Sequence, residues 1–141
     1  MARLIRYLSA GWWGSLTTIG FVVVPLLFMH LDTPAMAGQM AAKLFGAQTW
    51  ISVLCGVLWL LAERRQYRDQ PYSPSLPVLA ALLAALLLEL AVKPHIVARD
   101  NLMLWHNLGT GLYVLQWLCV SRLLWQGPKE KATEWVADIE A

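Results

Sequence analysis

The chain has 141 residues, of which 58% are hydrophobic and only 14% are charged, and its formal net charge is +2. A soluble domain of this size rarely has so few charged residues, so the long apolar runs predict membrane spans. The small net charge and the lack of a basic stripe or recognition motif argue against a nucleic-acid partner. We therefore expect the lipid bilayer to be the main partner.

The first hydrophobic run covers residues 8–31 and follows a short basic start. It is nearly free of charge and long enough to cross about 30 Å of hydrocarbon. Trp12 and Trp13 near its start are typical of an interfacial aromatic belt. Pro25 lies inside the run and is predicted to kink the helix or loosen its last turns.

A cleavable signal peptide is an alternative interpretation of this start. Two arginines precede the apolar run, and the Ala-Met-Ala sequence that ends at Ala37 resembles a peptidase site. The run is longer than a usual signal peptide, and its small residues suit packing against another helix. We expect a retained membrane span, with cleavage after Ala37 as the alternative.

Residues 32–43 are predicted to form a short interfacial helix that leads into the second span. Thr33 can cap a helix, and Pro34 suits the first helical position. Met36 and Met40 follow at a spacing of four residues, which places them on one helical face. The pattern therefore predicts a separate helix at the membrane surface.

Three more membrane spans are predicted, over residues 44–62, 76–92 and 102–125. A polar, basic loop separates the second span from the third, and a short loop over residues 93–101 leads to the fourth. Residues 127–141 form a short charged tail. We expect an all-α fold with one transmembrane domain over residues 1–126, an antiparallel up-and-down four-helix bundle.

The distribution of lysine and arginine predicts the orientation of these spans. Eight of the 11 basic residues lie at the N-terminus, between the second and third spans, or at the C-terminal end. The other three lie near the two remaining connections. Because cytoplasmic segments of membrane proteins are enriched in lysine and arginine, both termini are expected in the cytoplasm.

Unusual polar residues gather at the opposite, outer membrane face. The candidate functional cluster contains Glu89, Lys93, His95, His106, His30 and Asp32. Glu89 is the most informative, because an ionised carboxylate inside the bilayer is costly and usually has a partner. Lys93 lies four residues further on and therefore on the same helical face. The two residues predict either a structural ion pair or a proton- or cation-binding carboxylate at the mouth of a cavity.

The histidines also allow two interpretations. His106 starts the fourth span among small and amide residues, where a histidine is usually a hydrogen-bonded interfacial group. Its functional alternative is a ligand or proton carrier that pairs with Glu89 across the third and fourth helices. His95 and His30 are expected to be solvated residues at the membrane surface.

Binding of copper or haem is a second hypothesis for the same face, because copper accepts imidazole and thioether ligands. The candidate ligands are His30, His95, His106, Met29 and Met103. No ligand pairing of note supports this, and Met36 and Met40 suit helix packing equally well. Cys55 and Cys119 lie in apolar runs, so we expect them to be inert packing groups. The sequence predicts no cofactor.

Small residues on the first and fourth spans are candidates for helix packing, since they let a neighbouring helix approach closely. They are Gly11, Gly14, Gly20, Gly109 and Gly111. The same faces can serve a homo-oligomer or a partner in a membrane complex. The sequence has no hydrolase elbow, phosphate loop, dinucleotide fingerprint or HExxH motif, so we expect no enzymatic activity.

Four stretches carry a resemblance to a known family: GWWGSLTTIGFVVVPLLF (11–28), AGQMAAKLF (37–45), KPHIVARDN (93–101) and LWHNLGTGLYVLQWL (104–118). Over nearly the whole chain, the sequence resembles the transmembrane protein 205-like family of four-span membrane proteins. His95 stands where that family commonly has arginine after proline, and Asn107 replaces the usual glycine after His106. The resemblance implies a bacterial inner-membrane protein with no assigned activity and no agreed catalytic residues.

Together these features predict a non-enzymatic binding or accessory protein that handles a small solute or a proton at its outer face. One alternative is a redox protein that binds copper or haem through the outer histidines and methionines. The other alternative is a purely structural subunit of a membrane complex.

Overall fold

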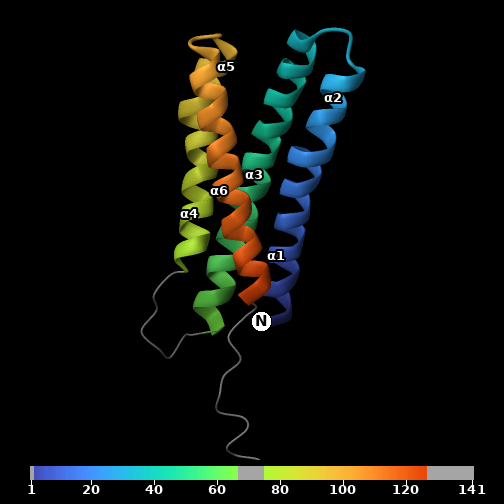
Figure 1. The fold of residues 1–141 in the computed structure, drawn as a ribbon. Coiled ribbons are helices and arrows are strands. Elements are labelled where there is room, and N and C mark those ends of the chain that lie inside the picture. Colours follow the sequence, from blue (N-terminus) through green and yellow to red (C-terminus); the bar gives the residue numbers. More distant parts are fainter. Residues whose placement is uncertain (1, 67–74, 127–141) are drawn as a thin grey trace, which may run out of the picture.

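The computed structural model describes residues 2–66 and 75–126, and Figure 1 shows long helices that lie side by side. In chain order the elements are α1 (Ala2–Thr17), η1 (Thr18–Val23), α2 (Val24–His30), α3 (Pro34–Gln66), α4 (Leu76–Leu87), η2 (Leu88–Val92), α5 (Lys93–Val97) and α6 (Leu102–Gln126). Both η segments are π-helical. Within these described residues the chain is all-α. The predicted tail, 127–141, and most of the basic loop lie outside them.

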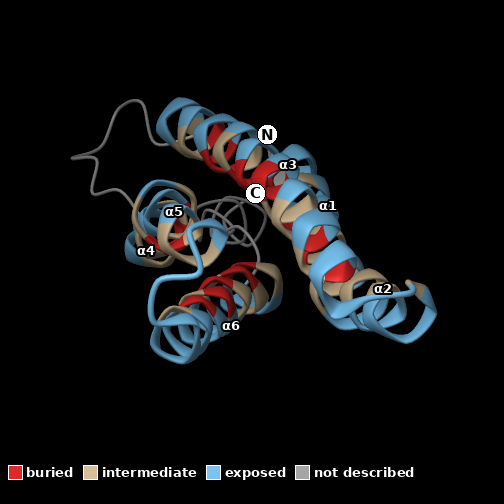
Figure 2. Ribbon diagram, turned by 90° about the horizontal axis from the view of Figure 1, so that it is seen from above, coloured by how far each residue is buried: buried red, intermediate tan, exposed pale blue. Residues whose placement is uncertain are grey.

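The elements form four helical stretches that alternate in direction. The connections between α2 and α3 and between α5 and α6 lie at one end of the molecule, which we call the turn end (Figure 1). Helices α1 and α4 each pack against both α3 and α6. Each of the four helices therefore has two main neighbours. Figure 2 shows that α2 leans away from α6 at the turn end.

Three of the helical stretches are long and apolar enough to cross a membrane, namely Arg3–His30, Pro34–Gln66 and Leu76–Val97. They indicate a membrane protein. Helix α6 is not among them, although its 25 residues give it a length of about 37 Å. Polar side chains such as Asn107 and Gln116 lower its mean hydropathy.

The separate interfacial helix predicted for residues 32–43 is wrong. One helix of 33 residues, α3, runs without interruption from Pro34. The predicted cap does form, since Thr33 Oγ1 accepts a hydrogen bond from the backbone N–H of Met36 at 3.2 Å. The only weak helix former in the first turns is Gly38, which costs about 1 kcal/mol and does not stop a helix. The predicted cleavage position, Ala37, is fully buried in this helix.

The loop predicted for residues 93–101 is also wrong in its first half, because the third helical stretch continues through α5 to Val97. A proline inside a helix removes one backbone donor and crowds the carbonyl four residues earlier. Pro94 and Pro25 each lie two residues after a π-helical segment. The wider π turn accommodates the ring, so neither proline ends its helix.

The core contains hydrogen bonds from tryptophan to small hydroxyl side chains. Trp12 Nε1 donates to Ser52 Oγ at 2.9 Å, and Trp59 Nε1 donates to Ser9 Oγ at 3.0 Å. Trp12 is completely buried, so its predicted place in an interfacial belt is wrong. A buried indole N–H needs an acceptor, and the serines on neighbouring helices supply it.

Candidate functional site

A cavity of about 850 Å³ lies between the helices at the turn end. All four helical stretches contribute to its walls, which are mainly apolar and include Phe21, Phe28, Phe45 and Tyr113. The polar residues of the lining are Gln48, Thr49, Glu89, Lys93, His106, Thr110 and Gln116. Ligand pockets typically combine this volume and apolar surface with a few polar groups.

Two glutamines form the deep end of the cavity. Gln48 lies 14 residues after the start of α3 and Gln116 lies 14 residues after the start of α6, about 21 Å along each helix. Their amide Nε2 atoms both donate to Ser52 Oγ, at 3.3 and 2.8 Å. Gln48 also donates to Ser15 Oγ at 3.0 Å. This hydrogen-bond network closes the cavity near the middle of the bundle.

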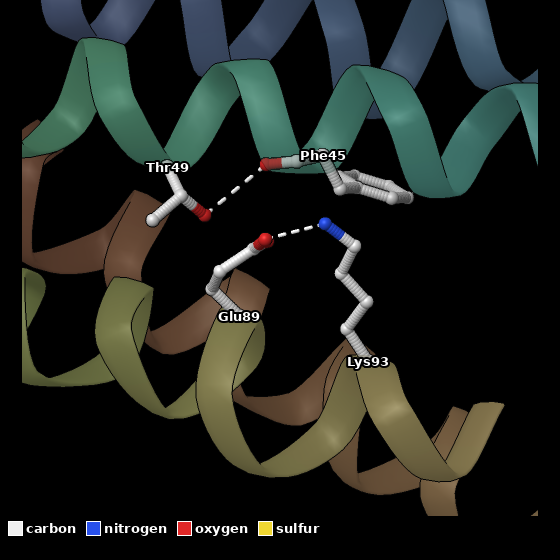
Figure 3. A network of polar contacts seen from close by, with 4 residues as sticks. All are labelled: Phe45, Thr49, Glu89 and Lys93. Carbon is white, nitrogen blue, oxygen red and sulfur yellow. Dashed lines mark hydrogen bonds and ion pairs between the residues drawn. The ribbon is translucent and has the colours of Figure 1, made fainter. Parts of the chain in front are cut away.

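The side wall of the cavity carries the ion pair that the sequence predicts. Lys93 Nζ binds Glu89 Oε1, and both side chains extend toward α3 beside Phe45 and Thr49 (Figure 3). Gly46 gives this pair its space, because a Cβ there would lie only 2.9 Å from Lys93 Nζ. The absence of a side chain at this position lets α3 pass close to the two charges.

The ion pair leaves hydrogen-bonding capacity unused. Within residues 2–66 and 75–126, neither Glu89 nor Lys93 has another hydrogen-bond or ion-pair partner. The nearby Thr49 hydroxyl donates to Phe45 O at 3.1 Å, within its own helix (Figure 3). The side chains of Lys93 and Glu89 remain 34% and 22% exposed. One carboxylate oxygen and two ammonium protons are therefore available to a molecule in the cavity.

Both π-helical segments contribute to the cavity wall. Gly20 and Phe21 come from η1, and Leu88, Glu89 and Val92 come from η2. A π-helical turn adds a residue to the helix and so shifts the direction of the side chains that follow. Such turns occur frequently at functional sites. Here one of them carries the carboxylate of the ion pair.

The cavity is open between α2 and α6. Among the described helices, α6 packs against α1, α4, η2 and α5 but not against α2. Phe28 on α2 and Met103 and Val114 on α6 line the cavity and are exposed. These apolar side chains border a lateral opening.

Only some residues of the predicted polar cluster line the cavity. Glu89, Lys93 and His106 line the cavity, and so does Met103. His106 has no hydrogen bond or ion pair to Glu89 within the described chain. The other members of the cluster and Met29 do not line the cavity.

The other two histidines have local partners. His95 stacks on Trp105 with a ring separation of 4.0 Å and lies 3.3 Å from Asp100 Oδ2. His30 Nδ1 lies 3.0 Å from Leu26 O, one turn back in its own helix. Asp32 is exposed in the α2–α3 connection. Of the described residues, no group of three or more His, Cys, Asp or Glu side chains could hold a metal together. Copper or haem binding stays a prediction.

The five glycines predicted to serve helix packing also divide into two groups. An added Cβ at Gly20 would collide with the Tyr113 ring, and one at Gly109 would lie 3.1 Å from Val92. A Cβ at Gly11, Gly14 or Gly111 would meet nothing within 4 Å in the described chain. The last three do not support packing between helices of this chain.

Sequence reasoning missed the glutamines at the deep end. Gln48 and Gln116 are only 2% and 1% exposed, although each lies in a predicted membrane span. Each glutamine lies in the middle of an apolar run, and this position could have identified it, because a polar group there needs a hydrogen-bond partner inside the protein. Their convergence on Ser52 depends on long-range packing and has no local signature.

Residues 7–103 match the model of a protein family described as Domain of unknown function (DUF4149). No curated protein matches the chain. No solved structure matches it either. The matched residues run from α1 to the start of α6 and include Gln48, Glu89 and Lys93, whereas His106 lies beyond them. The match covers more than half of the residues of the chain. The chain therefore belongs to the family described as Domain of unknown function (DUF4149).

Proposed function

We propose that this protein is a membrane-embedded binding protein that holds a small, largely apolar molecule in the cavity and catalyses no reaction on it. The observation that carries the proposal is the cavity of about 850 Å³, with aromatic walls and few polar groups. Burial of apolar surface supplies most of the affinity for such a ligand, at roughly 25 cal/mol per Å².

The proposal includes four membrane spans, with α6 as the fourth. Helix α6 is long enough to cross the hydrocarbon region, and it directs Gln116 into the bundle, where Ser52 accepts its hydrogen bond. Five of the eight lysines and arginines in the described ranges lie toward the end opposite the turn end, which supports cytoplasmic termini: Arg3, Arg6, Arg64, Arg65 and Arg122. The resemblance to the transmembrane protein 205-like family supports a bacterial inner membrane. The cavity then faces the periplasmic half of the bilayer.

The position of the opening supports entry from the bilayer. An apolar ligand partitions into lipid before it meets the protein, and the gap between α2 and α6 is bordered by apolar side chains such as Phe28 and Met103. The ligand can therefore move from lipid into the cavity without crossing water.

Cavity filling tests the proposal directly. Ala42 lines the cavity, so Ala42→Phe places a ring in the space of the ligand without removing a polar group. Ala47 lies on the same helix but is exposed and outside the cavity lining, so Ala47→Phe is the matched control. Each protein is placed in phosphatidylcholine nanodiscs and exposed to dodecanol that carries a diazirine photolabel.

We expect saturable labelling, which mass spectrometry maps to cavity residues, in the wild type and in Ala47→Phe. In Ala42→Phe this labelling is lost. Labelling that does not saturate, or that is equal in all three proteins, contradicts the proposal because it reports contact with lipid alone.

A further inference from the structure

We infer that the ligand carries a neutral group that both donates and accepts hydrogen bonds, such as a hydroxyl, and that the Glu89–Lys93 pair recognises this group. The inference rests on the proposed function, since it assumes that a ligand occupies the cavity. It adds the chemical class of the ligand: a neutral alcohol with an apolar body.

The charge of the site favours a neutral head group. Glu89 and Lys93 are the acidic and basic residues of the cavity lining, and they neutralise each other. A carboxylate or ammonium on the ligand would bring an uncompensated charge into apolar surroundings, which is costly. The histidine of the lining, His106, lies at the exposed start of α6 and has no hydrogen bond or ion pair to Glu89 or Lys93 in the described chain.

The hydrogen-bonding capacity of the pair favours a hydroxyl. Glu89 has an oxygen that can accept a hydrogen bond, and Lys93 has protons that it can donate. A hydroxyl satisfies both, because it donates to the carboxylate and accepts from the ammonium. A ketone or an ether can only accept, and a hydrocarbon does neither.

The apolar body of the ligand extends from this point along the aromatic wall. Phe45 lies beside the ion pair (Figure 3). Its ring meets that of Tyr113 edge to face, with the ring centroids 5.1 Å apart. The lateral opening lies on the α6 side of the same space. A single-chain alcohol can therefore place its hydroxyl at the pair and its chain toward the bilayer.

Competition in the same photolabelling assay tests the inference. The unlabelled competitors are dodecanol, dodecyl methyl ether, dodecanoate and dodecylamine, which share one chain and differ in the head group. We expect dodecanol to compete at least about tenfold better than the ether in the wild type, because the ether cannot donate to the charged Glu89. The two charged competitors are expected to be weaker than dodecanol as well.

Removing one charge at a time should change this preference in a defined direction. Glu89→Gln leaves the Lys93 charge alone, so dodecanoate should gain about tenfold in competition relative to dodecanol. Lys93→Met leaves the Glu89 charge alone, so dodecylamine should gain by a similar factor. The double variant Glu89→Gln/Lys93→Met is neutral again and should prefer neither ion.

Matched controls change the same charges outside the cavity. Asp32→Asn and Lys43→Met alter exposed residues that do not line it, and both should keep the preference of the wild type for dodecanol. A shift of preference in these controls as large as in the cavity variants would overturn the inference, since it would reflect the surface charge of the protein.

The results separate the inference from the proposed function. Saturable labelling with equal competition by all four compounds in the wild type overturns the inference and leaves the binding function standing. The same holds if the single-charge variants keep the preference of the wild type. Labelling that no compound displaces overturns the binding function itself, and the inference falls with it.

Discussion

The indole Nε1 of Trp12 donates a hydrogen bond to Ser52 Oγ at 2.9 Å and joins α1 to α3 in the centre of the bundle. The same hydroxyl oxygen accepts from the amides of Gln48 and Gln116. One serine therefore connects α1, α3 and α6 directly beneath the cavity. Since Trp12, Gln48, Gln116 and Ser52 are all buried, the three N–H donors depend on hydroxyl acceptors inside the protein: Ser52 for all three, and Ser15 as well for Gln48.

Ser52→Ala is predicted to lower the free energy of unfolding by about 1 kcal/mol, because the hydroxyl oxygen has two acceptor lone pairs for the buried donors around it and each lost hydrogen bond is worth about 0.6 kcal/mol in a membrane protein. Ser121→Ala is the control, since Ser121 Oγ accepts one side-chain hydrogen bond, from Trp13, and donates only to Trp117 O within its own helix. It should cost less than Ser52→Ala, because only one hydrogen bond between helices is lost. Reversible unfolding in mixed micelles gives both values. Equal losses would mean that the three hydrogen bonds are not centred on Ser52.

Gly56→Ala and Gly14→Ala are predicted to have opposite effects on stability. Alanine favours a helix over glycine by about 1 kcal/mol, and at Gly14 the new methyl group meets nothing within 4 Å. We expect Gly14→Ala to stabilise the protein by up to that amount. At Gly56 the methyl group would lie 2.8 Å from Leu82 Cγ and push α3 away from α4.

The overpacking at Gly56 costs about 1–3 kcal/mol, which exceeds the gain in helix propensity, so Gly56→Ala should be destabilising overall. Thermal unfolding of the two variants in one detergent makes the comparison. If Gly56→Ala is as stable as Gly14→Ala, then α3 and α4 do not pack as closely as the structure indicates.

Features of the site that depend on local spacing could be predicted from the sequence. Glu89 and Lys93 are four residues apart on one helix, so their contact follows from helical geometry. The cap at Thr33 depends in the same way on a spacing of three residues. By contrast, the meeting of Gln48 with Gln116 depends on how α3 and α6 pack, and no local pattern encodes that.

The predicted helix limits are wrong in two places, because prolines and polar residues are expected to end helices that in fact continue. The sequence predicts a loop over residues 93–101, whereas α5 continues past Pro94 because the π-helical η2 precedes it. The sequence also predicts a separate interfacial helix over residues 32–43, yet polar residues there, such as Lys43, lie on the exposed face of a continuous α3. Polarity predicts which face of a helix is exposed, but not where the helix ends.

The copper or haem hypothesis predicts a chromophore or a stoichiometric metal in protein purified in mild detergent. His106 lines the cavity, whereas His30 and His95 lie outside its lining. If His106 is a ligand, the wild type should show a Soret band or about one copper ion per chain, and His106→Ala should lose it. His95→Ala should keep it if the site lies in the cavity, because the His95 ring stacks on Trp105 outside the cavity lining. A colourless, metal-free wild type would contradict the hypothesis.

The number of membrane spans determines on which side of the membrane the C-terminus lies. Three spans, as counted from the apolar stretches alone, would place the two termini on opposite sides. Four spans, with α6 included, place them on the same side. We predict that green fluorescent protein fused after Ala141 fluoresces in bacterial cells and that alkaline phosphatase fused at the same position is inactive, because both remain in the cytoplasm.

A second pair of fusions in the α5–α6 turn provides the internal control, since this turn should lie in the periplasm. Arg99 and Asn101 adopt positive φ values of 57° and 37° there, which marks a tight turn between the third and fourth helical stretches. Alkaline phosphatase joined after Arg99 should therefore be active. Activity both there and after Ala141 would mean that α6 does not cross the membrane, and the cavity would then open beside a surface helix.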